Sequence, residues 1–288
     1  MKAMVFAAGL GTRLRPLTDS MPKALVPVCG EPLLHHVLCK LRSAGYDEIV
    51  VNVHHFAGQI RDYLETHDYG VHVSISDETD LLRETGGGIM HARRFLEGSG
   101  EDGVSNGSVA DKALRGNRFG KSPFEPLSAP ELHNADAFPS SPKPFLVHNV
   151  DIISDLDLQW FREQWRPGAL ATLLVSDRQT QRYLLFDDDM RLVGWTNIAT
   201  GEVRSPYPGL KADACRKFAF AGIHDISPEI FDVFEQTGCP DRFPVIDFYL
   251  KVCAEHPIYG AVPEKLRIVD VGKFDTLGEA ERLCASIL

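Results

Sequence analysis

The chain has 288 residues, of which 44% are hydrophobic and 24% are charged, proportions that are ordinary for a globular protein. Its net charge of −10 argues against a nucleic-acid or anionic-membrane partner. The six cysteines lack zinc-binding spacing, and neither a signal peptide nor an apolar run of about 18 residues is present. We therefore expect a cytoplasmic protein with reduced thiols.

The chain begins with a strand that runs directly into a glycine-rich loop. Residues 3–8 are short, apolar and partly β-branched, which predicts a buried strand. Gly9 and Gly11 follow, and glycine allows the backbone to approach a ligand closely. Successive N–H groups in such a turn can bind an anion.

The loop carries its own cations, which suits a triphosphate. Arg13 and Arg15 lie in it, and Lys23 follows Pro22. A Rossmann fingerprint would need glycine where Leu14 stands, and the Gly-Lys-Ser/Thr of a Walker loop is absent. Taken by itself, the loop is also compatible with a surface turn whose arginines are solvated.

The next elements alternate between helix and strand. Apolar residues at helical spacing predict a helix over 31–44, which Gly45 ends, and a second helix over 56–66. Residues 48–53 and 71–75 read as strands. This alternation predicts right-handed crossovers and a parallel sheet that helices cover on both faces.

A second glycine-rich segment precedes another helix, expected to run through Leu96. Gly86, Gly87 and Gly88 either offer bare N–H groups to a ligand or form a flexible turn before the helix. Residues 97–143 then break the pattern, being rich in Gly, Ser, Asn and Pro without any period. We interpret them as an insertion that is partly mobile, a lid or an oligomer contact.

An aspartate follows the next strand. Residues 145–150 read as that strand, and Asp151 comes directly after it, where α/β enzymes place metal-binding carboxylates. A simple turn residue or a helix N-cap is the alternative, although Asp155 or Asp157 is better placed to cap the helix expected over 158–165.

The remaining elements are shorter. We expect strands at 169–175, 183–187, 191–195 and 218–224, and helices after Ser227-Pro228, over 245–255 and over 276–288.

The first thirty-odd residues resemble a known family signature. Residues 7–18, 21–28 and 32–34 closely resemble the signature of the sugar-1-phosphate nucleotidyltransferases, which make nucleotide sugars from a nucleoside triphosphate and a sugar 1-phosphate. The resemblance implies an α/β fold, a Rossmann-like three-layer sandwich with a mixed, mostly parallel central sheet, the nucleotide-diphospho-sugar transferase fold. It also implies one domain over residues 1–288.

The resemblance assigns roles to individual residues. It implies that Arg13 and Lys23 are catalytic and that Mg²⁺ is held by Asp151 and by Asp270, in a segment similar to the family's second metal-binding motif. It places sugar contacts at Asn149 and Gly222. It implies nucleotide contacts at Ala8, Gly9, Gly11, Thr12, Arg13, Lys23, Gly86 and Gly87.

The chain departs from the family pattern before Asp151, at residues 194–197, and around Asp270, where residues 267–269 replace an aromatic stretch and Lys273-Phe274 replaces Thr-Pro. Val150 replaces the usual glycine before Asp151. Related enzymes often carry a Glu-Lys-Pro segment whose lysine contacts the sugar phosphate, and residues 194–197 read Gly-Trp-Thr-Asn instead. The anchor of the sugar phosphate therefore stays open among Arg178, Arg182, Lys211 and Lys217.

The substrates implied by the resemblance are a nucleoside triphosphate and a sugar 1-phosphate. The spelling of residues 84–88 looks most like the N-acetylmuramate-1-phosphate uridylyltransferase branch, which favours UTP with N-acetylmuramate 1-phosphate. GTP with mannose 1-phosphate or a heptose 1-phosphate is the alternative. A non-catalytic nucleotide-sugar sensor on the same fold is a further alternative, and Leu14 argues against a dinucleotide oxidoreductase. The oligomeric state stays open, a homo-oligomer included.

Overall fold

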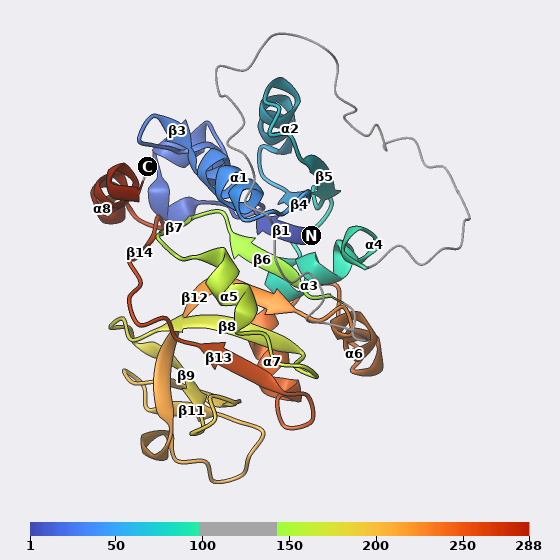
Figure 1. Ribbon diagram of the computed structural model, residues 1–288, viewed down its shortest axis with the longest axis vertical. Helices are drawn as coiled ribbons and strands as arrows, with labels where there is room; N and C mark the ends of the chain where they lie inside the picture. Colours follow the sequence, from blue (N-terminus) through green and yellow to red (C-terminus); the bar gives the residue numbers. More distant parts are fainter. Residues whose placement is uncertain (98–142, 288) are drawn as a thin grey trace, which may run out of the picture.

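The computed structural model describes residues 1–97 and 143–287 (Figure 1). The strands are β1 (Lys2–Phe6), β2 (Pro27–Val28), β3 (Glu31–Pro32), β4 (Glu48–Val53), β5 (His72–Asp77), β6 (Phe145–Asn149), β7 (Ile152–Ser154), β8 (Ala171–Ser176), β9 (Arg182–Phe186), β10 (Leu192–Asn197), β11 (Glu202–Arg204), β12 (Arg216–Ile226), β13 (Ile258–Ala261) and β14 (Ile268–Asp270). The helices are α1 (Leu33–Ser43), α2 (Ala57–Thr66), α3 (Glu84–His91), α4 (Arg93–Leu96), α5 (Leu158–Glu163), α6 (Ile230–Gln236), α7 (Val245–Val252) and α8 (Phe274–Ile287), with short 3-10 helices at Thr12–Leu14, Leu17–Asp19, Lys23–Leu25 and Ala212–Ala214.

Ten strands form one twisted sheet across the molecule (Figure 1). Its order is β11-β10-β9-β12-β6-β1-β4-β5. In addition, β8 pairs with β12, and β13 pairs with β8. The strands β6, β1, β4 and β5 are parallel, as are β8 and β13, whereas β12 is antiparallel to its neighbours. The predicted α/β fold with a mixed central sheet is therefore confirmed.

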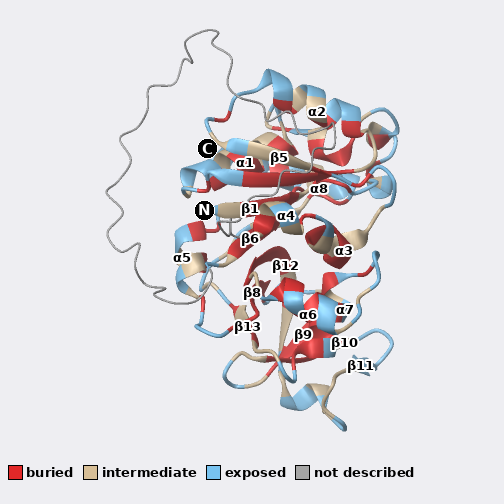
Figure 2. Ribbon diagram, turned by 90° about the vertical axis from the view of Figure 1, so that its right-hand side faces the viewer, coloured by how far each residue is buried: buried red, intermediate tan, exposed pale blue. Residues whose placement is uncertain are grey.

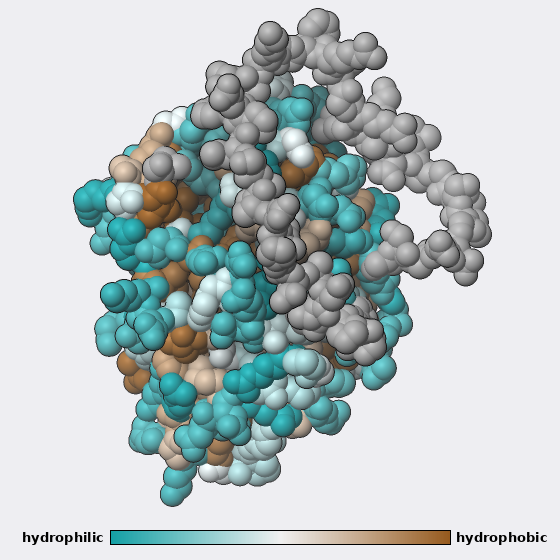
Figure 3. All heavy atoms as spheres, in the orientation of Figure 1, coloured by the Kyte–Doolittle hydropathy of each residue, from teal (hydrophilic) through white to brown (hydrophobic). Residues whose placement is uncertain are grey.

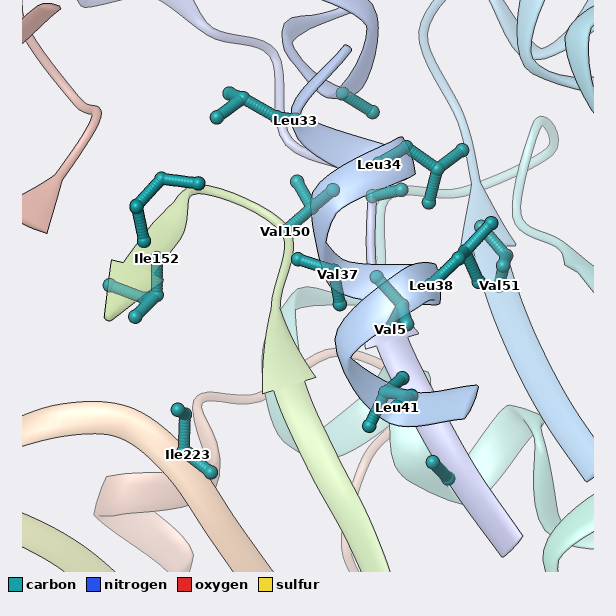
Figure 4. Close-up of a cluster of buried hydrophobic side chains, with 14 of the residues drawn as sticks. Val5, Leu33, Leu34, Val37, Leu38, Leu41, Val51, Val150, Ile152 and Ile223 are labelled. Carbon is teal, nitrogen blue, oxygen red and sulfur yellow. The ribbon is translucent and has the colours of Figure 1, made fainter. Parts of the chain in front are cut away.

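The sheet separates two hydrophobic cores, because successive side chains of a strand point to opposite faces. Ala3 and Val5 of β1 belong to the core under α1, whereas Met4 belongs to the core that includes residues of α3 and α7. Figure 4 shows Val5 of β1 beside Leu38 and other apolar side chains of α1. Figure 2 shows buried residues concentrated in the strands, with exposed residues on the outer sides of the helices. These layers form the predicted sandwich.

The predicted apolar stripe of the first helix is confirmed in α1, as is its end. Leu33, Leu34, Val37, Leu38 and Leu41 are all buried. Gly45 adopts a φ of 85°, and the N–H of the next residue, Tyr46, donates to the carbonyl of Leu41 at 3.0 Å.

A small two-stranded sheet, which was not predicted, lies beside α8. It pairs β7 with β14, two antiparallel strands of three residues each. Between β7 and α5, Asp157 caps α5 by accepting the N–H groups of Gln159 at 2.8 Å and Trp160 at 3.2 Å, one of the two caps expected. Asp155 instead binds Arg267, which precedes β14.

The outer surface seen in Figure 3 is largely hydrophilic, with hydrophobic residues in small groups. Among the described residues, none of the helices has the length and apolar character needed to span a membrane. All six cysteines are free thiols. The insertion predicted over residues 97–143 lies outside the described residues, apart from its two end residues, and the single-domain assignment stays a prediction.

Candidate active site

The ends of the parallel strands surround a cavity of about 560 Å³. The carboxyl ends of parallel strands meet at one edge of the sheet, which is where ligands bind in open α/β folds. The loop after β1 forms one wall, and residues at or just after the ends of β4, β5 and β6 form others. The lining residues are Phe6, Ala7, Ala8, Gly9, Leu10, Gly11, Thr12, Arg13, Lys23, Asn52, Glu78, Leu82, Glu84, Thr85, Asn149, Val150, Asp151, Pro244 and Gly272.

The conformation of the loop after β1 depends on Gly11. Gly11 has a φ of 63°, a conformation that residues with a Cβ rarely adopt. A Cβ added there would lie 2.8 Å from the Thr18 methyl group and 3.1 Å from Lys23 Cβ, so a larger residue would push both away. The Thr18 hydroxyl donates to the Gly11 carbonyl at 2.8 Å, which ties the loop to the residues that follow it.

The start of the same loop is held by a side chain from the neighbouring strand. Asn52 Oδ1, on β4, accepts the N–H of Ala7 at 2.7 Å and that of Ala8 at 3.2 Å. Its amide nitrogen donates to Glu78 Oε1 at 2.8 Å, and Glu78 Oε2 accepts the Arg83 N–H at 3.2 Å. Both polar side chains are buried, at 2% and 0% exposure, so these bonds satisfy groups that water cannot reach.

The pairing of β7 with β14 brings together two aspartates that are 119 positions apart in the chain, Asp151 and Asp270. Ile152 is in register with Asp270, and the Val271 N–H donates to the Asp151 carbonyl at 2.8 Å. Asp151 lies between β6 and β7, two residues after the end of β6, and Asp270 ends β14. The two predicted metal-binding carboxylates therefore belong to one site.

The two predicted catalytic cations meet these carboxylates. Lys23 Nζ forms an ion pair with Asp151 Oδ2, and the lysine is only 8% exposed, so its buried charge is compensated. The guanidinium of Arg13 lies against Gly272: a Cβ added to Gly272 would be 2.9 Å from Arg13 Nη2 and 2.7 Å from Asp270 Oδ1. Glycine at this position is what lets the arginine and the aspartate approach the same stretch of backbone.

Asp270 is electrostatically the most perturbed group of this site. Burial and the neighbouring charge of Asp151 raise the pKa of its carboxyl group, and the cations Lys23, Arg13 and Arg178 oppose that rise. Its Oδ1 is buried and, within residues 1–97 and 143–287, accepts no hydrogen bond. A buried, unpartnered carboxylate oxygen beside a second carboxylate is suited to binding a cation.

Two of the predicted nucleotide contacts lie outside the cavity wall. Gly86 and Gly87 are buried in α3, where an added Cβ would lie 2.2 Å from the Phe243 ring or 2.2 Å from the Asp241 carbonyl oxygen, respectively. Their neighbour Thr85 lines the cavity instead. The glycines thus permit close packing of α3 against the segment before α7, and their assignment to the nucleotide stays a prediction.

The predicted sugar contacts lie next to each other. Asn149, at the end of β6, lines the cavity. Gly222 of β12 adopts a φ of 75°, and an added Cβ would lie 2.8 Å from the amide nitrogen of Asn149. Because β12 pairs with β6, Gly222 lies beside Asn149 on the side of β6 toward β8 and β9.

Asn52 and Glu78 are site residues that the sequence analysis did not identify. The position of Asn52 near the end of the second strand was a usable signal, since strand ends in a parallel sheet converge. Glu78 directly follows β5 but lies outside any glycine-rich motif, so its burial could be learned only from the fold.

The first part of the chain matches a known family. Residues 2–107 match the family model described as "Nucleotidyl transferase". An N-acetylmuramate alpha-1-phosphate uridylyltransferase from Caulobacter vibrioides is 49% identical over 107 residues, which cover 36% of this chain and 44% of the relative. A mannose-1-phosphate guanylyltransferase from Arabidopsis thaliana is 35% identical over 103 residues, covering 35% of this chain and 28% of that protein. The predicted resemblance to the sugar-1-phosphate nucleotidyltransferases is confirmed.

The likeness to solved structures extends over the whole chain. An inositol-1-phosphate CTP transferase from T. maritima shares the fold with a TM-score of 0.67 and 12% identity, covering 99% of this chain and 95% of its own. At that identity the likeness defines the fold alone. The sequence relatives, in contrast, are covered over less than half of their length.

Proposed function

We propose that this protein transfers a nucleotidyl group from a nucleoside triphosphate to a sugar 1-phosphate and releases pyrophosphate. The observation that carries the proposal is the convergence of Arg13, Lys23, Asp151 and Asp270 at a cavity walled by a glycine-rich loop. Cations and carboxylates gathered at a bare backbone loop are suited to a reaction between phosphates.

The proposed reaction is an in-line displacement at the α-phosphorus. An oxygen of the sugar 1-phosphate forms a bond to that phosphorus while the bond to the bridging oxygen of pyrophosphate breaks. The attacking oxygen already carries negative charge, so the reaction requires neither a protein nucleophile nor a general base. Catalysis then consists of positioning and of stabilising charge, which Arg13 and Lys23 supply.

Asn52 restricts where the phosphates can be bound. It occupies the N–H groups of Ala7 and Ala8. The contacts available to the triphosphate are therefore those further along the loop, from Gly9 to Arg13, which line the cavity. Asn52 thus holds the loop in shape.

Asp151 and Asp270 fit a magnesium ion. Their oxygens are the ligand type that Mg²⁺ prefers, and the unpartnered Oδ1 of Asp270 is available for one. When bound, Mg²⁺ would supply positive charge to the reacting phosphates. Lys23, which is paired with Asp151, is placed to orient that carboxylate and to share its charge with the substrate.

For the substrates, we propose UTP and N-acetylmuramate 1-phosphate. The support is the name of the Caulobacter relative, which is 49% identical over 107 residues. GTP with mannose 1-phosphate or a heptose 1-phosphate is the second candidate, because the Arabidopsis relative is named a guanylyltransferase. The six free thiols suit the cytoplasm, which we propose as the location.

The test is a pyrophosphate-release assay with Mg²⁺. The protein is incubated with each of the four nucleoside triphosphates, paired with a panel of sugar 1-phosphates. We expect release only when both substrates are present, and we expect a chelator to abolish it. Asp151→Asn should also abolish it, whereas Asp188→Asn, in an exposed turn between β9 and β10, should leave it unchanged.

The outcomes separate the candidates. Release with UTP and N-acetylmuramate 1-phosphate supports the first pair, and release with GTP and mannose 1-phosphate supports the second. An absence of release with every pair, together with tight binding of a nucleotide sugar, would contradict the enzymatic function and favour the sensor. Activity that persists in Asp151→Asn would contradict the assigned metal site.

A further inference from the structure

A nucleotidyl transfer needs a positive charge for the phosphate of the second substrate, and this chain lacks the lysine that related enzymes use. Four basic residues were left as candidates by the sequence: Arg178, Arg182, Lys211 and Lys217. The structure places them in very different surroundings, which separates one from the other three.

The other three have different surroundings. Lys217 forms an ion pair at 2.7 Å with Asp213, four residues earlier in the chain. Lys211 is exposed, just before a 3-10 helix. Arg182 lines a second surface pocket of about 520 Å³, walled by residues of β10, β11 and the start of α7, which shares Pro244 with the cavity described above.

Arg178 is hydrogen-bonded to β12, the strand next to β6. It lies two residues beyond the end of β8, and its Nη2 donates to the carbonyl of Phe220 on β12 at 3.0 Å. Two residues further along β12 is Gly222, which packs against Asn149, a residue of the cavity wall. The register of β8 and β12 shifts between Phe220 and His224, so the strand is irregular at this point.

Arg178 lies in the neighbourhood of the site. Like Lys23 and Arg13, it is near enough to Asp270 for its positive charge to act on that carboxylate. Arg13 and Lys23 line the nucleotide cavity, but Arg178 does not. In the part of the chain that the structure describes, Arg178 forms no ion pair with a carboxylate. It is exposed, and its Nη2 donates the hydrogen bond to the Phe220 carbonyl.

We propose that Arg178 binds the phosphate group of the sugar 1-phosphate and places it beside the α-phosphate of the nucleotide. A guanidinium suits this task because its planar donors match the geometry of phosphate oxygens. The hydrogen bond to Phe220 orients the group two residues from Gly222, which lies against Asn149, and proximity to these two proposed sugar contacts favours the second substrate. This inference rests on the transferase function proposed above.

The test compares steady-state kinetics of Arg178→Gln with those of the wild type, using a substrate pair that the wild type accepts. We expect the KM for the sugar 1-phosphate to rise about 10- to 100-fold, because a hydrogen bond to a charged group is lost. The KM for the nucleoside triphosphate should stay within about twofold. Arg178→Lys keeps the charge and should recover part of the loss.

Two controls address the specificity of the effect. Lys217→Gln removes a positive charge near the start of β12 and should leave both KM values unchanged. If the wild type accepts several sugar 1-phosphates, Arg178→Gln should weaken all of them by a similar factor, since it contacts the group that they share. A residue that binds the sugar ring would change their ranking.

Two failures are distinguishable. If the wild type turns over a pair and Arg178→Gln leaves the KM for the sugar 1-phosphate unchanged, or raises only the KM for the nucleotide, this inference is wrong and the transferase function stands. If the wild type turns over no pair, the transferase function fails and the role of Arg178 fails with it.

Discussion

Arg13 and Arg15 are two residues apart in the same loop but have different surroundings. Arg13 lines the cavity and lies against Gly272, next to Asp270. Arg15 is 3.3 Å from the carboxylate of Asp19 and does not line the cavity. Arg13 is therefore placed to contact a substrate in the cavity, whereas Arg15 lies on the surface.

This difference predicts the effect of removing each arginine. Arg13→Ala should raise the barrier of the chemical step by about 2.7–4 kcal/mol, on the order of 10²–10³ in kcat, as for other single stabilisers of developing charge. Arg15→Ala should change kcat by less than about threefold, because an exposed ion pair contributes little. The measurement is pyrophosphate release under saturating substrates, and a near-normal kcat in Arg13→Ala would contradict its assigned role.

At the scale of the element, α3 shows that glycines near a site can serve packing. Three successive glycines would weaken an isolated helix, since glycine costs about 1 kcal/mol relative to alanine. In α3 they lie against other parts of the fold, and Gly87 faces the backbone carbonyl of Asp241 at a distance that excludes a methyl group. Close approach to the segment before α7 therefore outweighs helix propensity.

Two glycine-to-alanine variants test this reading. Gly87→Ala should lower the free energy of unfolding by about 1–3 kcal/mol, the range expected for overpacking. Gly58→Ala is the matched variant: Gly58 lies in α2 with open space around its Cα, so alanine should raise stability by about 0.5–1 kcal/mol. Denaturant unfolding measures both, and equal gains in stability would show that α3 is not closely packed at Gly87.

At the scale of the whole molecule, the sheet buries ionisable groups that link its stability to pH. Asp225 of β12 is fully buried, and burial raises the pKa of its carboxyl group to about 7 from an ordinary 3.8, against the opposing charge of Arg162. Burial also lowers the pKa of His148 and of His224 to about 3. Below their ordinary pKa of 6.5, both histidines bind a proton in the unfolded chain but not in the folded one. The two histidines therefore lower the free energy of unfolding in that range.

The sign for Asp225 is opposite. Between pH 3.8 and about 7 the folded state binds the proton and the unfolded state does not, so this group's contribution to stability is present below pH 3.8 and is lost as the pH rises to about 7. Asp225→Asn should therefore be more stable than the wild type at pH 8, with a gain that shrinks toward pH 4. Comparing urea midpoints of the two proteins cancels the histidine effects, and a gain independent of pH would contradict the assignment.

Features that depend on neighbouring residues could mostly be predicted from the sequence. The apolar period predicted α1, and the alternation of short apolar runs with helices predicted the parallel strands β1, β4 and β5. The loop with Gly11, Arg13 and Lys23 was recognisable because its chemistry lies within a short segment. Asp151 was recognisable for the same reason, as the residue that follows a buried strand.

The relations between distant segments could not be predicted in this way and are known from the fold. The three-residue strands β7 and β14 are too short to carry a period, yet their pairing places Asp151 beside Asp270. Asn52 and Glu78 support the loop through contacts with other strands. The sequence does not distinguish the four candidate cations for the sugar phosphate, because these basic residues follow no periodic pattern. Their different roles follow from which strands and carboxylates each one meets, and that is set by the pairing of β8, β9 and β12.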